Sequence, residues 1–228
     1  MPPDRFIPLF EKNGFIIRLD EYIWEQACIT LRRWIDHGLT PTPISVNMSR
    51  MHIHDPRLRE KLLDLMRRYE LPPHLLELEL TESAFLENES GLFESMKALQ
   101  AFGFQFSMDD FGSGYSSLNM LKSMPVDFIK IDRGFLNKVV TTERGKTVIR
   151  FSISLAREMS IKVIAEGVET EEQAAFLLQA GCAYAQGYFY SRPLPIPQFE
   201  ALAFGTEHPF PVAPSIKALA EKLEKGST

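Results

Sequence analysis

Several apolar runs in this chain end at or beside a residue that could hold a cation, a phosphate or a water. The runs are residues 43–47, 75–79, 104–110, 126–132, 162–166 and 183–186. The polar residues at their ends are Asn47, Glu79, Asp109, Asp110, Lys130, Glu166 and Gln186. Carboxylate and amide oxygens suit Mg²⁺, Mn²⁺ or Ca²⁺ better than zinc. The pattern therefore predicts a divalent-cation site.

The same residue types indicate a reaction. Carboxylates about 4 Å apart repel by about 4 kcal/mol at an effective dielectric of about 20, so a pocket that gathers them needs a counter-charge. One cation, or two that share Asp109, would supply it, bind a phosphate oxygen and acidify a water. Lys130 could hold that water, Glu166 could act as the general base, and Gln186 could donate to a substrate that Gly187 lets approach. Together they favour metal-assisted hydrolysis of a phosphodiester.

Helical stretches separate the runs and must position them. Apolar residues near helical spacing predict helices at 19–37, 56–69, 89–102, 116–123, 143–159 and 171–180. Asp20 could cap the first of these. Strand and helix thus alternate, and in such α/β folds the carboxyl ends of parallel strands meet on one face. We expect a TIM-type (β/α) barrel that lacks its first two strands, since residues 1–18 offer only a weak run at 15–17.

Other polar residues could support the site or could have only a local structural role. The loop 110–117 could order metals and close over a ligand, with Glu82 bracing it. Asp132 and Glu169 could support the site, although an ordinary helix cap or ion pair explains a single carboxylate equally well. His52 and His54 lack the spacing of a metal-binding helix and are expected to be solvated.

Composition limits the classes of protein to consider. The chain has 228 residues, 45% hydrophobic and 24% charged, with a formal charge of -5, which is ordinary for a globular protein and makes polymeric nucleic acid an unexpected partner. Two distant cysteines and no apolar run of about 20 residues indicate a cytoplasmic protein without a membrane segment. We expect a barrel domain at 1–203, and a linker with a short amphipathic helix at 204–228.

Ordered motifs along the chain resemble one known family, the EAL domains of bacterial cyclic-di-GMP phosphodiesterases. The matching segments are Phe6-Ile7-Pro8, Ser45-Val46-Asn47, residues 77–83 (ELELTES), residues 109–114 (DDFGSG), Lys130-Ile131-Asp132, residues 165–169 (AEGVE) and Gln186-Gly187. The resemblance implies hydrolysis of cyclic-di-GMP to linear pGpG with Mg²⁺ or Mn²⁺, and inhibition by Ca²⁺.

The resemblance also implies roles for individual residues. Metal ligation falls to Asn47, Glu79, Asp109 and Asp110. Water positioning falls to Lys130 and the proposed base to Glu166. The remaining matches imply substrate or metal-water contacts by Gln186 and Glu169, loop support by Glu82, and a supporting role for Asp132. A homodimer and a sensory or GGDEF domain ahead of Met1 fit the family as well.

One departure from the family concerns the motif that names it. The family carries a Glu-Ala-Leu motif, whose glutamate ligates metal, on a strand that would precede Phe6. We expect this glutamate to be absent from the chain, with Met1 aligned to the interior of the domain. Loss of a charged ligand should weaken cation binding and remove most turnover. The alternative function is a non-catalytic EAL-like domain that binds cyclic-di-GMP or a protein partner.

Overall fold

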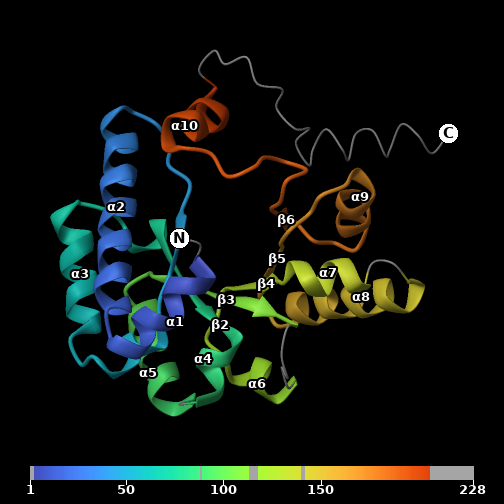
Figure 1. Ribbon diagram of the computed structural model, residues 1–228, viewed down its shortest axis with the longest axis horizontal. Helices are drawn as coiled ribbons and strands as arrows, with labels where there is room; N and C mark the ends of the chain where they lie inside the picture. Colours follow the sequence, from blue (N-terminus) through green and yellow to red (C-terminus); the bar gives the residue numbers. More distant parts are fainter. Residues whose placement is uncertain (1–2, 88, 113–117, 140–141, 206–228) are drawn as a thin grey trace. The chain divides into compact units, whose positions relative to one another are not determined.

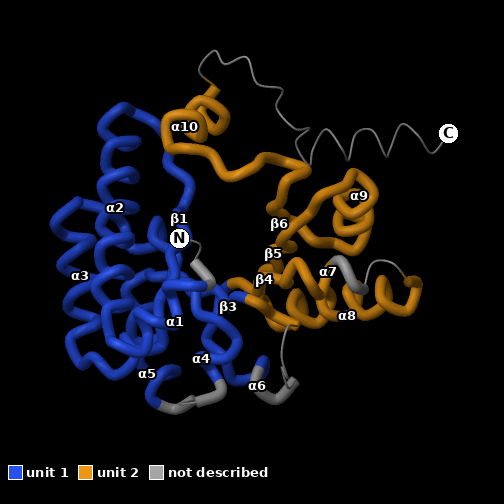
Figure 2. Tube along the Cα trace, in the orientation of Figure 1, with its two compact units in different colours: residues 1–109, 116–127 blue, residues 110–115, 128–228 orange. Residues whose placement is uncertain are grey.

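The computed structural model describes residues 3–87, 89–112, 118–139 and 142–205. Strands and helices alternate along these residues (Figure 1). The chain divides into two compact units (Figure 2): unit 1 holds the described residues of 1–109 and 116–127, and unit 2 holds those of 110–115 and 128–228. Among the described residues, no helix combines the length and apolar character needed to cross a membrane.

Unit 1 contains a parallel sheet with helices packed against it. Its elements are α1 (Pro3–Asn13), α2 (Ile16–Asp36), β1 (Ile44–Asn47), α3 (Leu58–Arg68), β2 (Leu76–Thr81), α4 (Glu82–Glu87), α5 (Glu89–Gln100), β3 (Gln105–Phe111, whose last two residues belong to unit 2) and α6 (Leu118–Ser123). Short 3₁₀ turns lie at Arg50–His54 and Pro73–Leu75. Strand β2 pairs in parallel with β1 and with β3. Helix α2 packs against β1 and β2.

The two faces of β2 differ in chemistry. Leu76, Leu78 and Leu80 point to one face and are at most 1% exposed, whereas Glu77 and Glu79 alternate with them and point to the other. A strand with apolar residues on one face only would normally place its polar face in water. Both glutamates are nevertheless buried, so this unit gathers acidic groups inside the protein.

Unit 2 repeats the alternation of strand and helix. Its elements are β4 (Phe128–Ile131), α7 (Arg133–Val139), α8 (Glu143–Glu158), β5 (Lys162–Ala165), α9 (Glu171–Gln179), β6 (Tyr184–Ala185) and α10 (Ile196–Phe204). Strand β5 pairs in parallel with β4 and with β6. Thr142 caps α8 by accepting from the Gly145 N–H, and Thr170 forms a capping box with Gln173 at the start of α9.

The predicted strands and helices are confirmed within the described residues, apart from shifts of a few residues at their ends. The expectation that residues 1–18 supply no further strand is confirmed for the described residues 3–18, which contain α1 and the start of α2. The rings of Phe6 and Phe10, one helical turn apart, lie 5.4 Å from each other and support α1 despite its prolines. Helices α4 and α7, of six and seven residues, were not predicted. The predicted linker and terminal helix after residue 205 lie outside the described residues.

Candidate active site

Three of the four predicted cation ligands lie on one sheet face of unit 1. Asn47, the last residue of β1, is the register partner of Glu79 on β2. Glu79 is in turn the partner of Ser107 on β3, and Asp109 lies two residues beyond Ser107 and so points to the same face. The fourth ligand, Asp110, belongs to unit 2.

This donor set fits a hard cation by its chemistry. An amide oxygen from Asn47 and carboxylates from Glu79 and Asp109 are the donors that Mg²⁺ and Ca²⁺ accept. Among the residues that the structure describes, no three His, Cys, Asp or Glu side chains are grouped so as to hold a metal. Unit 1 itself brings two carboxylates and one amide to the face, and metal ligation by these residues stays a prediction.

The backbone at Asp110 is unusual. Its φ angle is +59°, in the left-handed region that residues other than glycine rarely occupy. Asp tolerates this conformation better than most residues do, but the position still costs about 1 kcal/mol or more. Such conformations are concentrated at functional sites, which agrees with the predicted role of the Asp109-Asp110 pair.

A hydrogen-bonded cluster of Lys130, Glu166 and Gln186 lies at the strand ends of unit 2. The Lys130 Nζ is 2.7 Å from Glu166 Oε1, and Gln186 Nε2 donates to the same oxygen over 2.6 Å. Backbone bonds from Glu166 N–H to the Ile131 carbonyl and from Gln186 N–H to the Ala165 carbonyl extend the sheet past its strands. The chain thereby holds the predicted base between a cation and an amide donor.

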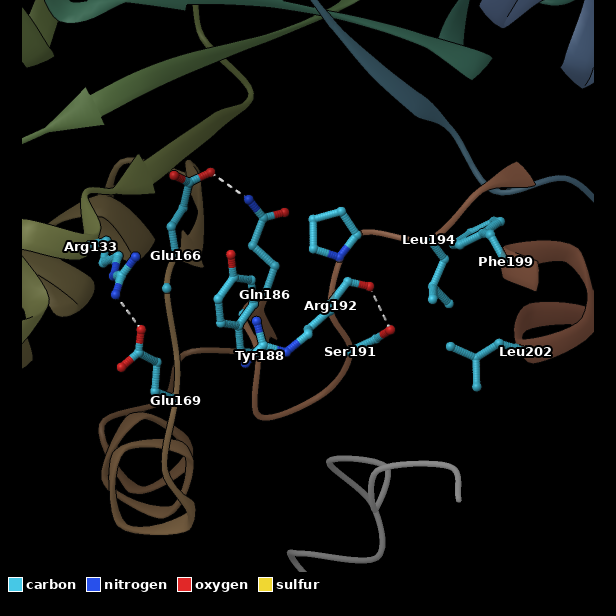
Figure 3. Close-up of a pocket in the computed structure, with 13 residues that line it drawn as sticks. Arg133, Glu166, Glu169, Gln186, Tyr188, Ser191, Arg192, Leu194, Phe199 and Leu202 are labelled. Carbon is cyan, nitrogen blue, oxygen red and sulfur yellow. Dashed lines mark hydrogen bonds and ion pairs between the residues drawn. The ribbon is translucent and has the colours of Figure 1, made fainter. Parts of the chain in front are cut away.

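A cavity of about 520 Å³ adjoins this cluster (Figure 3). Glu166 and Gln186 point toward each other on one side of it, and Leu194, Phe199 and Leu202 form an apolar side. Polar and apolar walls of this kind suit a ligand that combines charged groups with flat rings.

Two arginines also line the cavity. The Arg192 guanidinium lies over the Tyr188 ring, 4.5 Å from its centroid, and Arg133 forms an ion pair with Glu169. Guanidinium groups bind phosphate well because they present several N–H donors in one plane. Arg133 and Arg192 were not predicted as site residues, and no spacing in the sequence marks them.

Gly187 is required by a close contact with the chain's own backbone. A Cβ at this position would lie 2.2 Å from both the backbone N and O of Val168. Val168 N–H donates to the Gln186 carbonyl, and Phe189 N–H donates to the Val168 carbonyl. The glycine therefore lets the backbone at residue 187 approach the backbone of Val168. This contact fixes the position of the peptide that follows Gln186.

The remaining predicted residues have local partners. Asp132 Oδ1 accepts from the Phe135 N–H at 2.8 Å and caps α7. Glu82 is 3% exposed at the start of α4, and part of the loop that it was predicted to brace, residues 113–117, lies outside the described residues. The prediction for His52 is wrong: it is fully buried beside Asp20, whereas His54 is exposed. Asp20 does not cap α2, which begins at Ile16.

The parallel strand pairs, the intervening helices and the polar strand ends define an α/β protein of the (β/α) barrel type. Residues 1–193 match the EAL domain family. The chain therefore belongs to the EAL domain family. The chain does contain the three residues Glu200-Ala201-Leu202. They lie within helix α10, however, and not at a strand end as the family's motif does.

Curated relatives and solved structures agree with this assignment. The chain is 37% identical over 199 residues to the bifunctional diguanylate cyclase/cyclic di-GMP phosphodiesterase MucR of Pseudomonas aeruginosa, covering 87% of this chain and 29% of MucR. It is 36% identical over 217 residues to the cyclic di-GMP phosphodiesterase NbdA of the same species, covering 95% of this chain and 28% of NbdA.

Among solved structures, the PaMucR phosphodiesterase in complex with c-di-GMP is 37% identical, with a TM-score of 0.81 and coverage of 87% of this chain and 81% of that one. The EAL domain of Mycobacterium smegmatis DcpA is 32% identical, with a TM-score of 0.75 and coverage of 83% and 86%. The chain spans less than a third of MucR and NbdA.

Proposed function

We propose that this domain hydrolyses cyclic-di-GMP to linear pGpG in a reaction that depends on Mg²⁺ or Mn²⁺. The observation that carries the proposal is the Lys130, Glu166 and Gln186 cluster beside a cavity, in a chain whose relatives include cyclic di-GMP phosphodiesterases. Bound c-di-GMP in the related PaMucR structure supports the choice of ligand.

Asn47, Glu79, Asp109 and Asp110 would hold one or two divalent cations. The cations would supply a polarised phosphate oxygen and an acidified water. Unit 1 contributes three of these donors from adjacent parallel strands. Their mutual repulsion without a cation is the physical reason to expect strong dependence on the ion.

Glu166 would accept the proton of the attacking water. Its carboxylate is already oriented, because Lys130 and Gln186 both contact Oε1. Lys130 is 6% exposed and would hold the same water or a phosphate oxygen. A base held in one orientation loses little entropy when the reaction occurs.

The cavity in unit 2 would take part of the nucleotide. Arg133 and Arg192 offer cations to phosphate oxygens, and Tyr188 and Phe199 offer aromatic surface to a guanine ring. A phosphodiester with two bases matches this combination better than a small anion would.

A nucleotide assay with three cations tests the proposal. Purified protein would be incubated with cyclic-di-GMP and Mg²⁺, Mn²⁺ or Ca²⁺, and the nucleotides would be separated by chromatography. We expect pGpG with Mg²⁺ and Mn²⁺, inhibition by Ca²⁺, and no product after chelation. Binding without hydrolysis would instead support the non-catalytic alternative, and neither binding nor hydrolysis would reject both.

The wider context is proposed on the same basis. Because the chain spans less than a third of MucR and NbdA, we propose that the domain works beside a sensory or GGDEF domain in a longer bacterial signalling protein in the cytoplasm. A homodimer is also proposed. Light scattering on the purified protein would report its mass, and a monomer at every concentration would reject the dimer.

A further inference from the structure

Helix α2 holds the peptide segment that carries Asn47 at two points. Asp20 and Trp24 are four residues apart and so lie on the same face of the helix. Trp24 binds the carbonyl of Asn47 itself, and Asp20 binds the N–H of Ser49 two residues later. The intervening Met48 N–H donates to the Glu79 carbonyl on β2 at 2.8 Å.

Trp24 is held by one hydrogen bond and one ring contact. Its side chain is 1% exposed, and its Nε1–H donates to the Asn47 carbonyl over 2.9 Å. Its ring lies against the His52 ring, with centroids 4.5 Å apart. A buried indole N–H needs an acceptor, and here the acceptor is the backbone of a predicted cation ligand.

Asp20 connects the second point of attachment to His52. Its Oδ2 accepts from Ser49 N–H at 2.9 Å and lies 3.1 Å from His52 Nε2. The Nδ1 of His52 has no hydrogen-bond partner among the described residues. The tautomer with hydrogen on Nε2 satisfies Asp20 and leaves Nδ1 as an acceptor, which costs less than burying an unpaired N–H.

A network of this kind is expensive if packing is its only purpose. Asp20 is 5% exposed and His52 is fully buried, and apolar residues of similar size could fill the same space without desolvating a carboxylate. Trp24 and Asp20 instead bind the segment from Asn47 to Ser49, and the His52 side chain contacts both of them.

We propose that Asp20, Trp24 and His52 are positioning residues that set the orientation of Asn47 as a cation ligand. The inference rests on the proposed function, because it assigns these residues to the same cation site. Groups that orient metal ligands from behind are worth about 10- to 100-fold in metal affinity in proteins.

The two tryptophans of α2 provide a matched pair for the test. Trp34 is 3% exposed in the same helix, but its indole is not the donor to Asn47. Calorimetric titration with Mn²⁺, and with cyclic-di-GMP in the presence of Ca²⁺, should show Trp24→Phe weakening metal affinity at least about tenfold. Trp34→Phe should leave the metal affinity unchanged. Both substitutions should lower the free energy of unfolding, and by similar amounts.

Two substitutions at His52 distinguish the effect of its hydrogen bond to Asp20 from the effect of its side-chain volume. Gln places an N–H donor near the Nε2 position of His52, so His52→Gln should keep metal affinity close to that of the unmodified protein, whereas His52→Ala should lower it. Asp20→Asn should also lower it, because its amide cannot accept from both Ser49 and His52 as well as a carboxylate does.

Three outcomes would overturn the inference. Equal metal affinity of Trp24→Phe and the unmodified protein would refute it and leave the proposed function standing. Equal weakening by Trp24→Phe and Trp34→Phe would show general destabilisation and also refute it. An unmodified protein that binds neither Mn²⁺ nor cyclic-di-GMP would refute the proposed function and, with it, this inference.

Discussion

Lys130 and Glu166 form an ion pair in unit 2, with Lys130 Nζ 2.7 Å from Glu166 Oε1 and their side chains only 8% and 18% exposed. Lys130 is the next-to-last residue of β4, and Glu166 directly follows the last residue of β5. Parallel pairing of Ile131 with Ala165 brings the two side chains to the same end of the sheet. The pair is thus a direct product of strand register.

Glu166→Gln tests the base. Gln keeps the size of the side chain and a hydrogen-bonding oxygen but cannot take a proton from water, so we expect turnover to fall about 10²- to 10⁴-fold. Affinity for cyclic-di-GMP with Ca²⁺, measured by calorimetry, should change far less. Glu158→Gln, at an exposed residue of α8, should leave both unchanged. Full turnover by Glu166→Gln would contradict the assignment.

Arg133→Ala tests the cavity. Arg133 and Glu169 form an ion pair with side chains 56% and 37% exposed, so its loss should alter the free energy of unfolding by less than about 1 kcal/mol. We expect weaker cyclic-di-GMP binding all the same, because a cation is lost from the cavity wall. Arg144→Ala removes an exposed arginine of α8 as a control. The prediction fails if the two variants bind the nucleotide equally.

Gly187→Ala tests the close backbone contact. The new Cβ would overlap the Val168 backbone at 2.2 Å, at a φ of +157°, so we expect a loss of at least about 1–3 kcal/mol in the free energy of unfolding. Gly38→Ala is the matched control, since Gly38 also has a positive φ, +73°, but no atom within 4 Å. Chemical denaturation should show the smaller loss for Gly38→Ala, and equal losses would refute the explanation.

Cys28 should make stability depend on alkaline pH. Burial, with a smaller effect of the charge on Glu25, raises its pKa from 9.0 to about 12. Well below pH 9 the thiol is protonated in folded and unfolded chains, so its contribution to the free energy of unfolding is fully present. Between about pH 9 and 12 only the unfolded chain loses this proton, and stability falls by up to about 1.4 kcal/mol for each pH unit.

The variant Cys28→Ala isolates this contribution. Other groups titrate in the same range in both proteins, so the difference between their denaturation curves reports the thiol. We expect the unmodified protein to lose more stability than Cys28→Ala between pH 9 and pH 11. Parallel curves over that range would show that the Cys28 thiol ionises as easily when folded.

The strand ends were predictable because both signals involved are local. Apolar runs bounded by polar residues mark short buried strands, and strands separated by helices must run parallel. From this alone we expected the polar strand ends to share one face, whereas the pairing of Asn47 with Glu79 and of Lys130 with Glu166 comes from the structure. Helices α1, α4 and α7 were not predicted, whereas α6, which is as short as α4, was.

The positions of single polar residues could not be read in the same way. His52 was expected in solvent and lies fully buried, and Asp20 was expected to cap a helix and instead accepts from Ser49. An aspartate can either cap a helix or accept a hydrogen bond inside the protein. Which of the two occurs depends on the segments that pack over it. Local sequence carries no information on a partner 29 residues away.

The sequence by itself determined the family, the alternation of strand and helix, and which residue types stand at the strand ends, because these depend on neighbours along the chain. Tertiary structure alone decided the pairing of Arg133 with Glu169 and the contact of Trp24 with Asn47. It also decided the close approach of the Val168 backbone to Gly187, which leaves no space for a Cβ there. Those choices depend on distances between segments far apart in the chain, which only packing sets.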